Sequence, residues 1–147
     1  MMAKKKILEE GRDYTFRSYF ELSYEPDEIL AEFDYKLIIK ELSLPKTNTE
    51  LQGTTELQQK IRKVLPLVSL DNEIARKEIL VSPILLEIVL YCECKIRFDY
   101  QLEVSNILKG NLDYLLQLKN QFLVIEAKND DLTRGFTQLA VELIALS

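Results

Sequence analysis

Three consecutive segments with the hydrophobic pattern of β-strands lie between residues 95 and 128, and this feature constrains the fold more than any other. In the first segment, KIRFDYQLEV, apolar and polar residues alternate, as they do in a strand with one buried face. NLDYLLQL and the denser apolar run FLVIEAK follow, separated by a short turn at Lys119 and Asn120. The sequence therefore predicts a small sheet that contains an antiparallel hairpin.

Helical patterns precede the predicted strands. Residues 55–65 carry an apolar stripe at helical spacing, which predicts a short amphipathic helix. Residues 69–94 predict a second helix, in which Ser82 and Pro83 mark either a kink or a new start. Its second half, PILLEIVLYC, is apolar on nearly every side, so we expect it to pack against the core.

A further helix is expected after the strands, capped by Asp130 or Asp131. One face of this helix is apolar and is expected to pack on the core; it carries Leu132, Phe136, Leu139, Ala140 and Leu143. The opposite face is polar; it carries Arg134, Gln138 and Glu142. Solvation explains this polar face most simply, and a contact between Arg134 and a nucleic-acid phosphate is the alternative.

Residues 1–50 are expected to form an N-terminal layer of the same domain. The segment YTFRSYFELSY fits both a strand and a helix. Residues 27–33 predict a helix, and residues 36–44 predict a strand. With residues 51–147 as the core, the fold class is α/β in the broad sense, with the α+β arrangement of helices packed on a mixed sheet.

Composition excludes several classes of protein. The 147 residues, 47% of them hydrophobic, suit one globular domain. A membrane-spanning helix needs a run of about 18 apolar residues, and the sequence contains none. Because the chain has no histidine, Ser-His-Asp and Cys-His catalysis are excluded within it. Cys92 and Cys94 are poorly spaced for a stabilising disulfide, which favours a reducing, cytoplasmic location.

The predicted hairpin brings two acids together. Because Asp113 and Glu126 lie equally far from the turn at Lys119 and Asn120, they are expected to face one another across the two strands. Side chains alternate along a strand, so Lys128 is expected on the same side as Glu126. Adjacent carboxylates repel unless a cation lies between them, and hard oxygen donors suit Mg²⁺, for which Mn²⁺ can substitute. The spacing therefore predicts a metal site.

Two interpretations stay open for the hairpin and for one further acid. The charged residues of the hairpin could instead form an ordinary ion pair on a solvated face. Glu87 is the only charged residue between Glu78 and Glu93, inside an otherwise apolar helix. It could lie near the metal as a third acid, with Glu78 as the fallback, or reach solvent at the helix edge.

Residues 110–143 resemble the PD-(D/E)XK nuclease superfamily. The likeness rests on the strand that contains Asp113, the apolar strand before the Glu126-Ala127-Lys128 triplet, and the capped helix that follows. It is strongest to the nuclease domain at the start of type I restriction-enzyme R subunits and to small restriction-endonuclease-like proteins of cyanobacteria. Leu112 stands where the family motif has proline.

The resemblance implies a restriction-endonuclease-like core with the hairpin at its centre. It implies that Asp113 and Glu126 are catalytic acids that hold the metal, and that Lys128 is the catalytic lysine. Glu87 would match the acid of the preceding helix, and Gln138 a glutamine that some members carry. The family core has a further strand after this helix, whereas the sequence stops at Ser147 inside an apolar helical pattern. The chain is therefore expected either to be a fragment or to complete its sheet in another way, with a second copy or a partner chain that covers the C-terminal helix.

The sequence thus predicts a Mg²⁺-dependent endonuclease that hydrolyses DNA phosphodiester bonds. The net charge of −5 argues against a general basic surface, so contact with DNA would have to be local or shared. The alternatives are a nuclease-like module that binds nucleic acid or protein without cutting, and a structural protein without a site.

Overall fold

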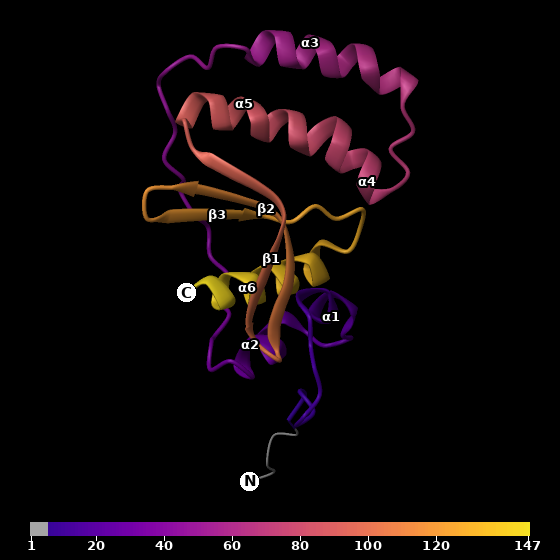
Figure 1. Ribbon diagram of the computed structural model, residues 1–147, viewed down its shortest axis with the longest axis vertical. Helices are drawn as coiled ribbons and strands as arrows, with labels where there is room; N and C mark the ends of the chain where they lie inside the picture. Colours follow the sequence, from indigo (N-terminus) through magenta and orange to yellow (C-terminus); the bar gives the residue numbers. More distant parts are fainter. Residues whose placement is uncertain (1–5) are drawn as a thin grey trace.

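The chain forms an α+β fold around a three-stranded antiparallel sheet, seen in a computed structural model that describes residues 6–147 (Figure 1). The strands lie in the order β1-β2-β3, and their bounds are Lys95–Ser105, Leu108–Leu118 and Gln121–Ile125. All three strands expected from the hydrophobic pattern are therefore present, but both pairs of described strands are antiparallel, so the prediction of a mixed sheet was wrong. β3 ends at Ile125, so Glu126 and Lys128 follow the strand and do not belong to it.

The register of the β2–β3 hairpin is the predicted one. Leu118 pairs with Gln121 and Tyr114 with Ile125, which leaves Lys119 and Asn120 as the turn. Lys119 has a φ of 52°, in the left-handed region that the first central residue of some tight hairpin turns requires. The turn thus sets which residues of the two strands face one another.

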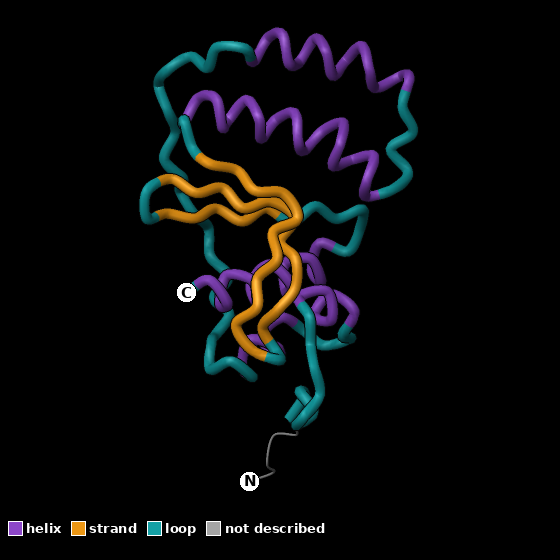
Figure 2. Tube along the Cα trace, in the orientation of Figure 1, coloured by secondary structure: helices purple, strands orange, loops and turns teal. Residues whose placement is uncertain are grey.

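β1 and β2 are long and bend sharply near their middle (Figure 2). Phe98 pairs with Tyr114 and Tyr100 with Leu112, so Asp99 and Asp113 occupy the opposed positions between these two pairs. Asp99 has a φ of 48°, which an extended strand does not accommodate. The bend therefore falls beside Asp113.

Three helices cover one side of the sheet: α1 (Phe16–Glu21), α2 (Pro26–Ala31) and α6 (Leu132–Leu146) (Figure 1). The ambiguous segment YTFRSYFELSY is resolved as helix α1, whose start is fixed by a capping box between Thr15 and Ser18. The buried cluster on this side joins N-terminal and C-terminal parts of the chain: Leu8, Tyr14, Phe16, Tyr19, Ile29, Leu112, Leu115, Val124 and Val141.

The other side of the sheet carries the remaining helical elements, α3 (Thr54–Val64), η1 (Leu65–Leu67), α4 (Glu73–Arg76), η2 (Lys77–Val81) and α5 (Ser82–Cys92). α4, η2 and α5 form one continuous helix, as predicted for residues 69–94. Its middle, η2, is a wide π-helical turn, which suits the position before Pro83, because proline cannot donate the ordinary α-helical hydrogen bond.

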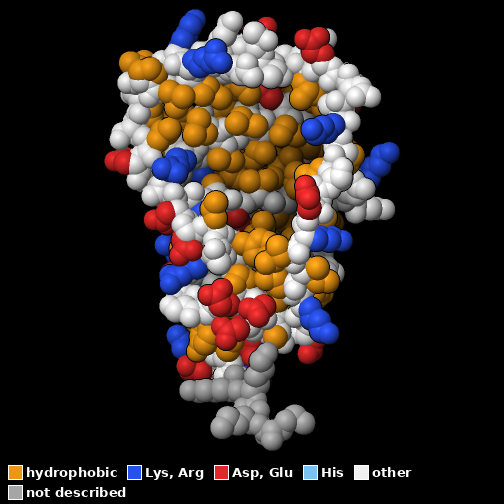
Figure 3. Space-filling view, turned by 180° about the vertical axis from the view of Figure 1, so that it is seen from behind, with side chains coloured by type: hydrophobic (Ala, Val, Ile, Leu, Met, Phe, Trp, Pro, Cys, Tyr) orange, Lys and Arg blue, Asp and Glu red, His pale blue; other side chains and the backbone are white. Residues whose placement is uncertain are grey.

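Only one face of α5 contacts the sheet. Leu85 is buried with Tyr114 and Leu116, whereas Leu86 and Leu90 are exposed. PILLEIVLYC therefore packs on the core as expected, but through one face only. Its outer side instead borders a groove against α3, and apolar side chains gather on this part of the molecule (Figure 3).

The strand expected at residues 36–44 is absent. The segment between α2 and α3 is extended but irregular, and Ile38 and Ile39 are exposed. Its apolar run has the composition of a strand, but a strand also needs a partner edge, and no described strand pairs with it.

Among residues 6–147, no helix is long and apolar enough to cross a membrane.

Candidate functional site

Asp113 and Glu126 face one another, as the register predicts. Asp113 lies in β2 beside the bend, and Glu126 directly follows β3. The backbone N–H of Asp113 donates to Glu126 Oε1 at 3.1 Å, and the N–H of Ala127 donates to Asp113 Oδ2 at 3.0 Å. Each carboxylate is therefore fixed by the backbone of the opposite segment, and these contacts continue the hairpin ladder beyond its last strand pair.

Lys128 joins the pair from the loop after β3. Its Nζ lies 3.3 Å from Glu126 Oε2, and the two side chains are only 11% and 4% exposed. The ammonium also lies 4.8 Å from the centre of the Phe20 ring, a cation–π distance. Gly135 makes room for the aliphatic stem, because a Cβ at that position would lie 2.9 Å from Lys128 Cγ. The structure thus brings together all three residues of the predicted triplet site.

Gln138 connects helix α6 to the two acids. Its Nε2 donates to Glu126 Oε2 at 3.1 Å and to Glu142 Oε1 at 2.9 Å. Glu142 is completely buried, and its Oε2 has no hydrogen-bond partner among residues 6–147. A third carboxyl group, which the sequence analysis assigned to the solvated face, therefore lies beside the site.

The predicted orientation of α6 was wrong. The helix begins after Asp131, which caps it as predicted, but the buried face carries Gly135, Gln138, Val141 and Glu142. On the face predicted to be the core, Leu132 is 80% exposed. The side of the helix that carries Gly135 packs on the hairpin because this glycine lets Lys128 approach. Hydrogen bonds between the polar groups offset only part of the cost of their burial, because Gln138 Oε1 and Glu142 Oε2 have no partner among residues 6–147.

Lys77 is a site residue that the sequence analysis missed. Its Nζ lies 2.7 Å from Asp113 Oδ1 and 5.4 Å from the centre of the Tyr114 ring. A signal was available, since Lys77, Val81 and Leu85 recur every fourth residue, and the latter two contact the sheet. That spacing places the ammonium on the side of the helix that faces β2.

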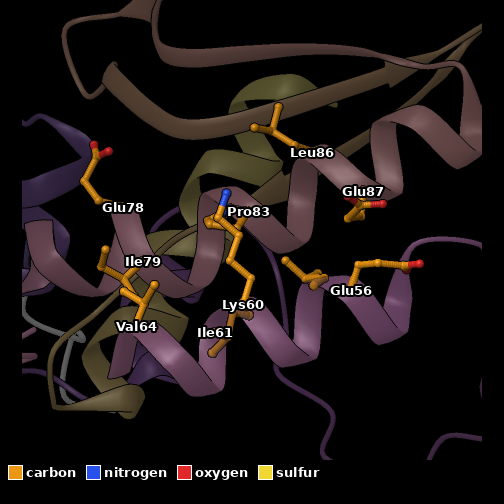
Figure 4. Close-up of a pocket in the computed structure, with 10 residues that line it drawn as sticks. Glu56, Lys60, Ile61, Val64, Glu78, Ile79, Pro83, Leu86 and Glu87 are labelled. Carbon is orange, nitrogen blue, oxygen red and sulfur yellow. The ribbon is translucent and has the colours of Figure 1, made fainter. Parts of the chain in front are cut away.

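Glu87 is not part of the site. It points toward α3, where a Cβ on Gly53 would lie only 2.6 Å from Glu87 Oε2, and it lines the groove with Glu56 (Figure 4). The helix face that meets the sheet carries Leu85, so Glu87 is turned away from it. A carboxylate beside the first turn of α3 is electrostatically favourable there. Of the two interpretations left open for Glu87, the structure therefore does not support the one that makes it a third metal-binding acid.

Two other candidates also lie outside the site. Glu78, the fallback acid, lines the groove between α3 and α5 (Figure 4). Arg134, the suggested phosphate contact, pairs with Asp131 at 3.1 Å in the first turn of α6 and is 41% exposed. It remains near the surface and makes no described contact with Asp113, Glu126 or Lys128.

Burial and crowding change the acidity of the site. Burial and the negative charge of Asp113 raise the pKa of Glu126, and burial together with Glu126 raises the pKa of Glu142 to about 9. Burial is the largest single influence on Lys77 and opposes its charge, but the hydrogen bond to Asp113, the negative charge of Asp113 and smaller contributions from Tyr114 and Glu73 together outweigh it and raise the pKa of Lys77. Positive charge is therefore favoured next to these carboxylates.

The donor set suits Mg²⁺ more than a metal that needs a full protein cage. No group of three or more His, Cys, Asp or Glu residues within 6–147 is arranged to hold a metal ion. Mg²⁺ is commonly held by one or two carboxylates, with water and substrate oxygens completing its shell. Asp113 and Glu126 provide such a pair of carboxylates, and the Lys77 ammonium already places a positive charge beside Asp113.

An apolar groove lies apart from these residues. The space between α3 and α5 has a volume of about 440 Å³ and is lined by Leu57, Ile61, Pro83 and Leu86, among others (Figure 4). Asp113, Glu126 and Lys128 do not line it. The candidate site is therefore the carboxylate cluster and not this groove.

Comparison with known proteins adds no relative: no family model, no curated protein and no solved structure matches the chain.

Proposed function

We propose that this protein is a Mg²⁺-dependent nuclease that hydrolyses phosphodiester bonds of DNA. The observation that carries the proposal is the pairing of Asp113 and Glu126 across the hairpin, with Lys128 3.3 Å from Glu126. This is the acid, acid and lysine set that the resemblance to the PD-(D/E)XK superfamily implies. We also propose that the helices and sheet form a core of the restriction-endonuclease type.

The roles follow from the chemistry of each group. Asp113 and Glu126 would hold the metal through their carboxylate oxygens. Bound there, Mg²⁺ would polarise the phosphate and lower the pKa of the attacking water. Lys128 orients that water and stabilises the negative charge that develops on the phosphate. Its low exposure supports this role, because a dry environment strengthens an electrostatic contact.

Gln138 is the positioning residue of this site. Its single amide group contacts both Glu126 and Glu142, so it fixes the carboxylate of Glu126 from the helix side. The buried Glu142 in turn fixes the amide. We therefore assign both residues to the support of Glu126 and not to contact with the substrate.

A specific observation favours a second candidate, a nuclease-like module that binds nucleic acid or protein without cutting. Each oxygen of Asp113 and Glu126 already has a hydrogen-bonding or charged partner within the described chain. A site satisfied in this way can persist as structure alone. The two candidates differ in whether a divalent cation binds at Asp113.

Titration calorimetry with Mn²⁺ and Mg²⁺ tests the proposal directly. We expect wild type to bind the metal and Asp113→Asn to lose binding, because the variant removes one of two carboxylates. Asp13→Asn is the matched control, since Asp13 forms a 2.7 Å pair with Lys109 outside the site, as Asp113 does with Lys77. The control should bind metal as wild type does.

Cleavage of plasmid DNA in the same buffers then separates binding from chemistry. Lys128→Ala should still bind the metal but reduce cleavage about a hundredfold or more. Absence of metal binding by wild type would favour the non-cutting module. Undiminished cleavage by Lys128→Ala would show that the lysine has been given the wrong role.

A further inference from the structure

The contacts of the two acids differ in origin. Glu126 Oε1, Glu126 Oε2 and Asp113 Oδ2 contact groups of the hairpin, its following loop and α6. Asp113 Oδ1 contacts Lys77 Nζ, which comes from η2 on the other side of the sheet. Among the described contacts of these carboxylate oxygens within residues 6–147, the one with Lys77 thus comes from the opposite side of the sheet.

This contact lies at the accessible edge of the site. The Lys77 and Asp113 side chains are 25% and 18% exposed, whereas that of Glu126 is 4% exposed. A cation that arrives from solvent therefore meets Asp113 before Glu126. Moving a long, single-bonded side chain disturbs less structure than moving a backbone N–H donor.

The position of Lys77 is nevertheless built into the fold. Its ammonium lies over the ring of Tyr114, and the hydroxyl of Tyr114 lies 2.9 Å from Ser82 Oγ. The wide turn of η2 comes immediately before this serine. The helix that contains η2, the ring of Tyr114 and the ammonium of Lys77 thus pack together and hold a positive charge next to Asp113.

We propose that Lys77 is an internal, displaceable counter-ion of Asp113 that competes with the divalent metal for this carboxylate. Without metal, the ammonium neutralises Asp113. When metal binds, the Lys77 ammonium leaves Oδ1. Lys77 therefore sets the metal concentration at which the site fills, an inference that rests on the proposed metal-dependent function.

Competition of this kind is reciprocal. Whatever free energy the Lys77–Asp113 contact contributes to the metal-free protein must be given up when the metal binds. Removing the ammonium should therefore tighten metal binding. If Lys77 instead helped to hold the metal through substrate or water, removing its ammonium would weaken metal binding.

The test is titration calorimetry with Mn²⁺ alone, on wild type, Lys77→Met and Lys109→Met. Methionine keeps the length of the stem and removes the charge. We expect Lys77→Met to bind Mn²⁺ about fivefold more tightly than wild type. Lys109→Met removes a pair of the same 2.7 Å length, with Asp13, and should leave the affinity unchanged. Lys77→Arg keeps the charge and should stay close to wild type.

Each outcome decides the matter. If wild type binds Mn²⁺ and Lys77→Met binds it equally or more weakly, the counter-ion role is wrong while the metal site stands. If Lys109→Met binds Mn²⁺ more tightly by the same factor, the change in net charge explains the effect, and the counter-ion role of Lys77 is wrong too. If neither wild type nor Lys77→Met binds Mn²⁺, the proposed function fails and this inference with it.

A measurement on the wild-type protein guards against a variant that does not fold. The NMR signal of the Lys77 side-chain ammonium should move when Mg²⁺ is added, because its partner is taken away. The Lys109 signal should not move. An unchanged Lys77 signal at saturating Mg²⁺ would overturn the proposal without any substitution.

Discussion

The carboxyl group of Glu142 is completely buried and lies beside the amide of Gln138 and the second acid Glu126. A charged carboxylate loses its hydration there, and Glu126 adds repulsion, so the pKa of Glu142 rises from 4.5 to about 9. The folded protein therefore keeps a proton on Glu142 over a range in which the unfolded chain releases it. Protein stability is coupled to this proton.

The sign of that coupling gives a prediction. Between about pH 4.5 and 9 the folded state holds more protons on Glu142 than the unfolded state, so the free energy of unfolding falls as pH rises. Glu142→Gln has no such proton. Relative to wild type, it should gain at least about 1.4 kcal/mol, the equivalent of one pKa unit, between pH 5 and pH 8.5. Urea denaturation at a series of pH values measures this difference.

Glu41→Gln is the control, because Glu41 is exposed in the segment between α2 and α3. Its unfolding free energy should follow wild type at every pH. Parallel curves for wild type and Glu142→Gln would contradict the buried proton.

Among single residues, the sequence predicted that Asp113, Glu126 and Lys128 lie together. The hairpin register places Asp113 opposite Glu126 once the turn is known, whereas Lys128 reaches Glu126 from the loop after β3 and not through strand alternation. The sequence did not predict Glu142 or Lys77. A polar residue on a helix is ordinarily solvated, and only tertiary packing shows that α6 turns its polar face inward.

The bend in the long β1–β2 ribbon positions the site among the secondary-structure elements. Asp99, with its φ of 48°, lies opposite Asp113, and its Oδ1 accepts a hydrogen bond from Asn111 at 2.8 Å. Leu112 packs with α1 and α6, whereas Tyr114 packs with α5. Residues two apart on one strand would share a side in a flat sheet, so the bend allows Asp113 to lie between the two layers.

Substitution of Asp99 tests this role. Asp99→Val should destabilise the protein by about 1–3 kcal/mol, because a β-branched side chain disfavours the left-handed region. Asp99→Gly loses the same hydrogen bond but accepts this backbone conformation, so it should stay within about 1 kcal/mol of wild type. Gln101→Val, two residues further along β1 in an exposed position, should be nearly neutral. Chemical denaturation compares the three.

If Asp99→Val and Asp99→Gly lower the free energy of unfolding equally, the left-handed backbone of the bend is not the cause of the loss. The lost hydrogen bond with Asn111 would then explain it.

The sequence predicted the three strands and the cap of α6, since both depend on local pattern. It did not predict the bend, because aspartate in the left-handed region leaves no mark in an alternating pattern. It also placed a strand at residues 36–44, where the composition is right but a partner edge is lacking.

Across the whole molecule, the chain passes twice between the two layers. α1 and α2 lie on the same side as α6, and the segment of residues 36–50 then runs past the sheet to α3 on the other side (Figure 1). Sequence patterns identify layers but not the side on which each packs, since an apolar helix face fits either side of a sheet. The N-terminal layer was therefore predicted to exist, but its position beside α6 was not.

This arrangement predicts how the protein responds to limited digestion with trypsin. The segment between α2 and α3 is irregular and exposed, and it contains Lys36, Lys40 and Lys46, so the first cut within residues 6–147 should fall there. The two fragments should nevertheless elute together in gel filtration. Buried contacts join them, because Tyr19 packs in the cluster that contains Val141 and donates a 2.7 Å hydrogen bond to the Ile107 carbonyl.

The triple variant Lys36→Gln, Lys40→Gln and Lys46→Gln is the control, and it should resist this first cut while other sites are cut at the wild-type rate. Separation of the fragments without denaturant would mean that α1 and α2 are held mainly by the covalent chain. Because Phe20 of α1 lies against the Lys128 ammonium, the proposed metal binding should then weaken in the nicked protein as well. Retained association with unchanged Mn²⁺ affinity would instead establish that packing alone, without chain continuity, keeps the N-terminal layer on the site.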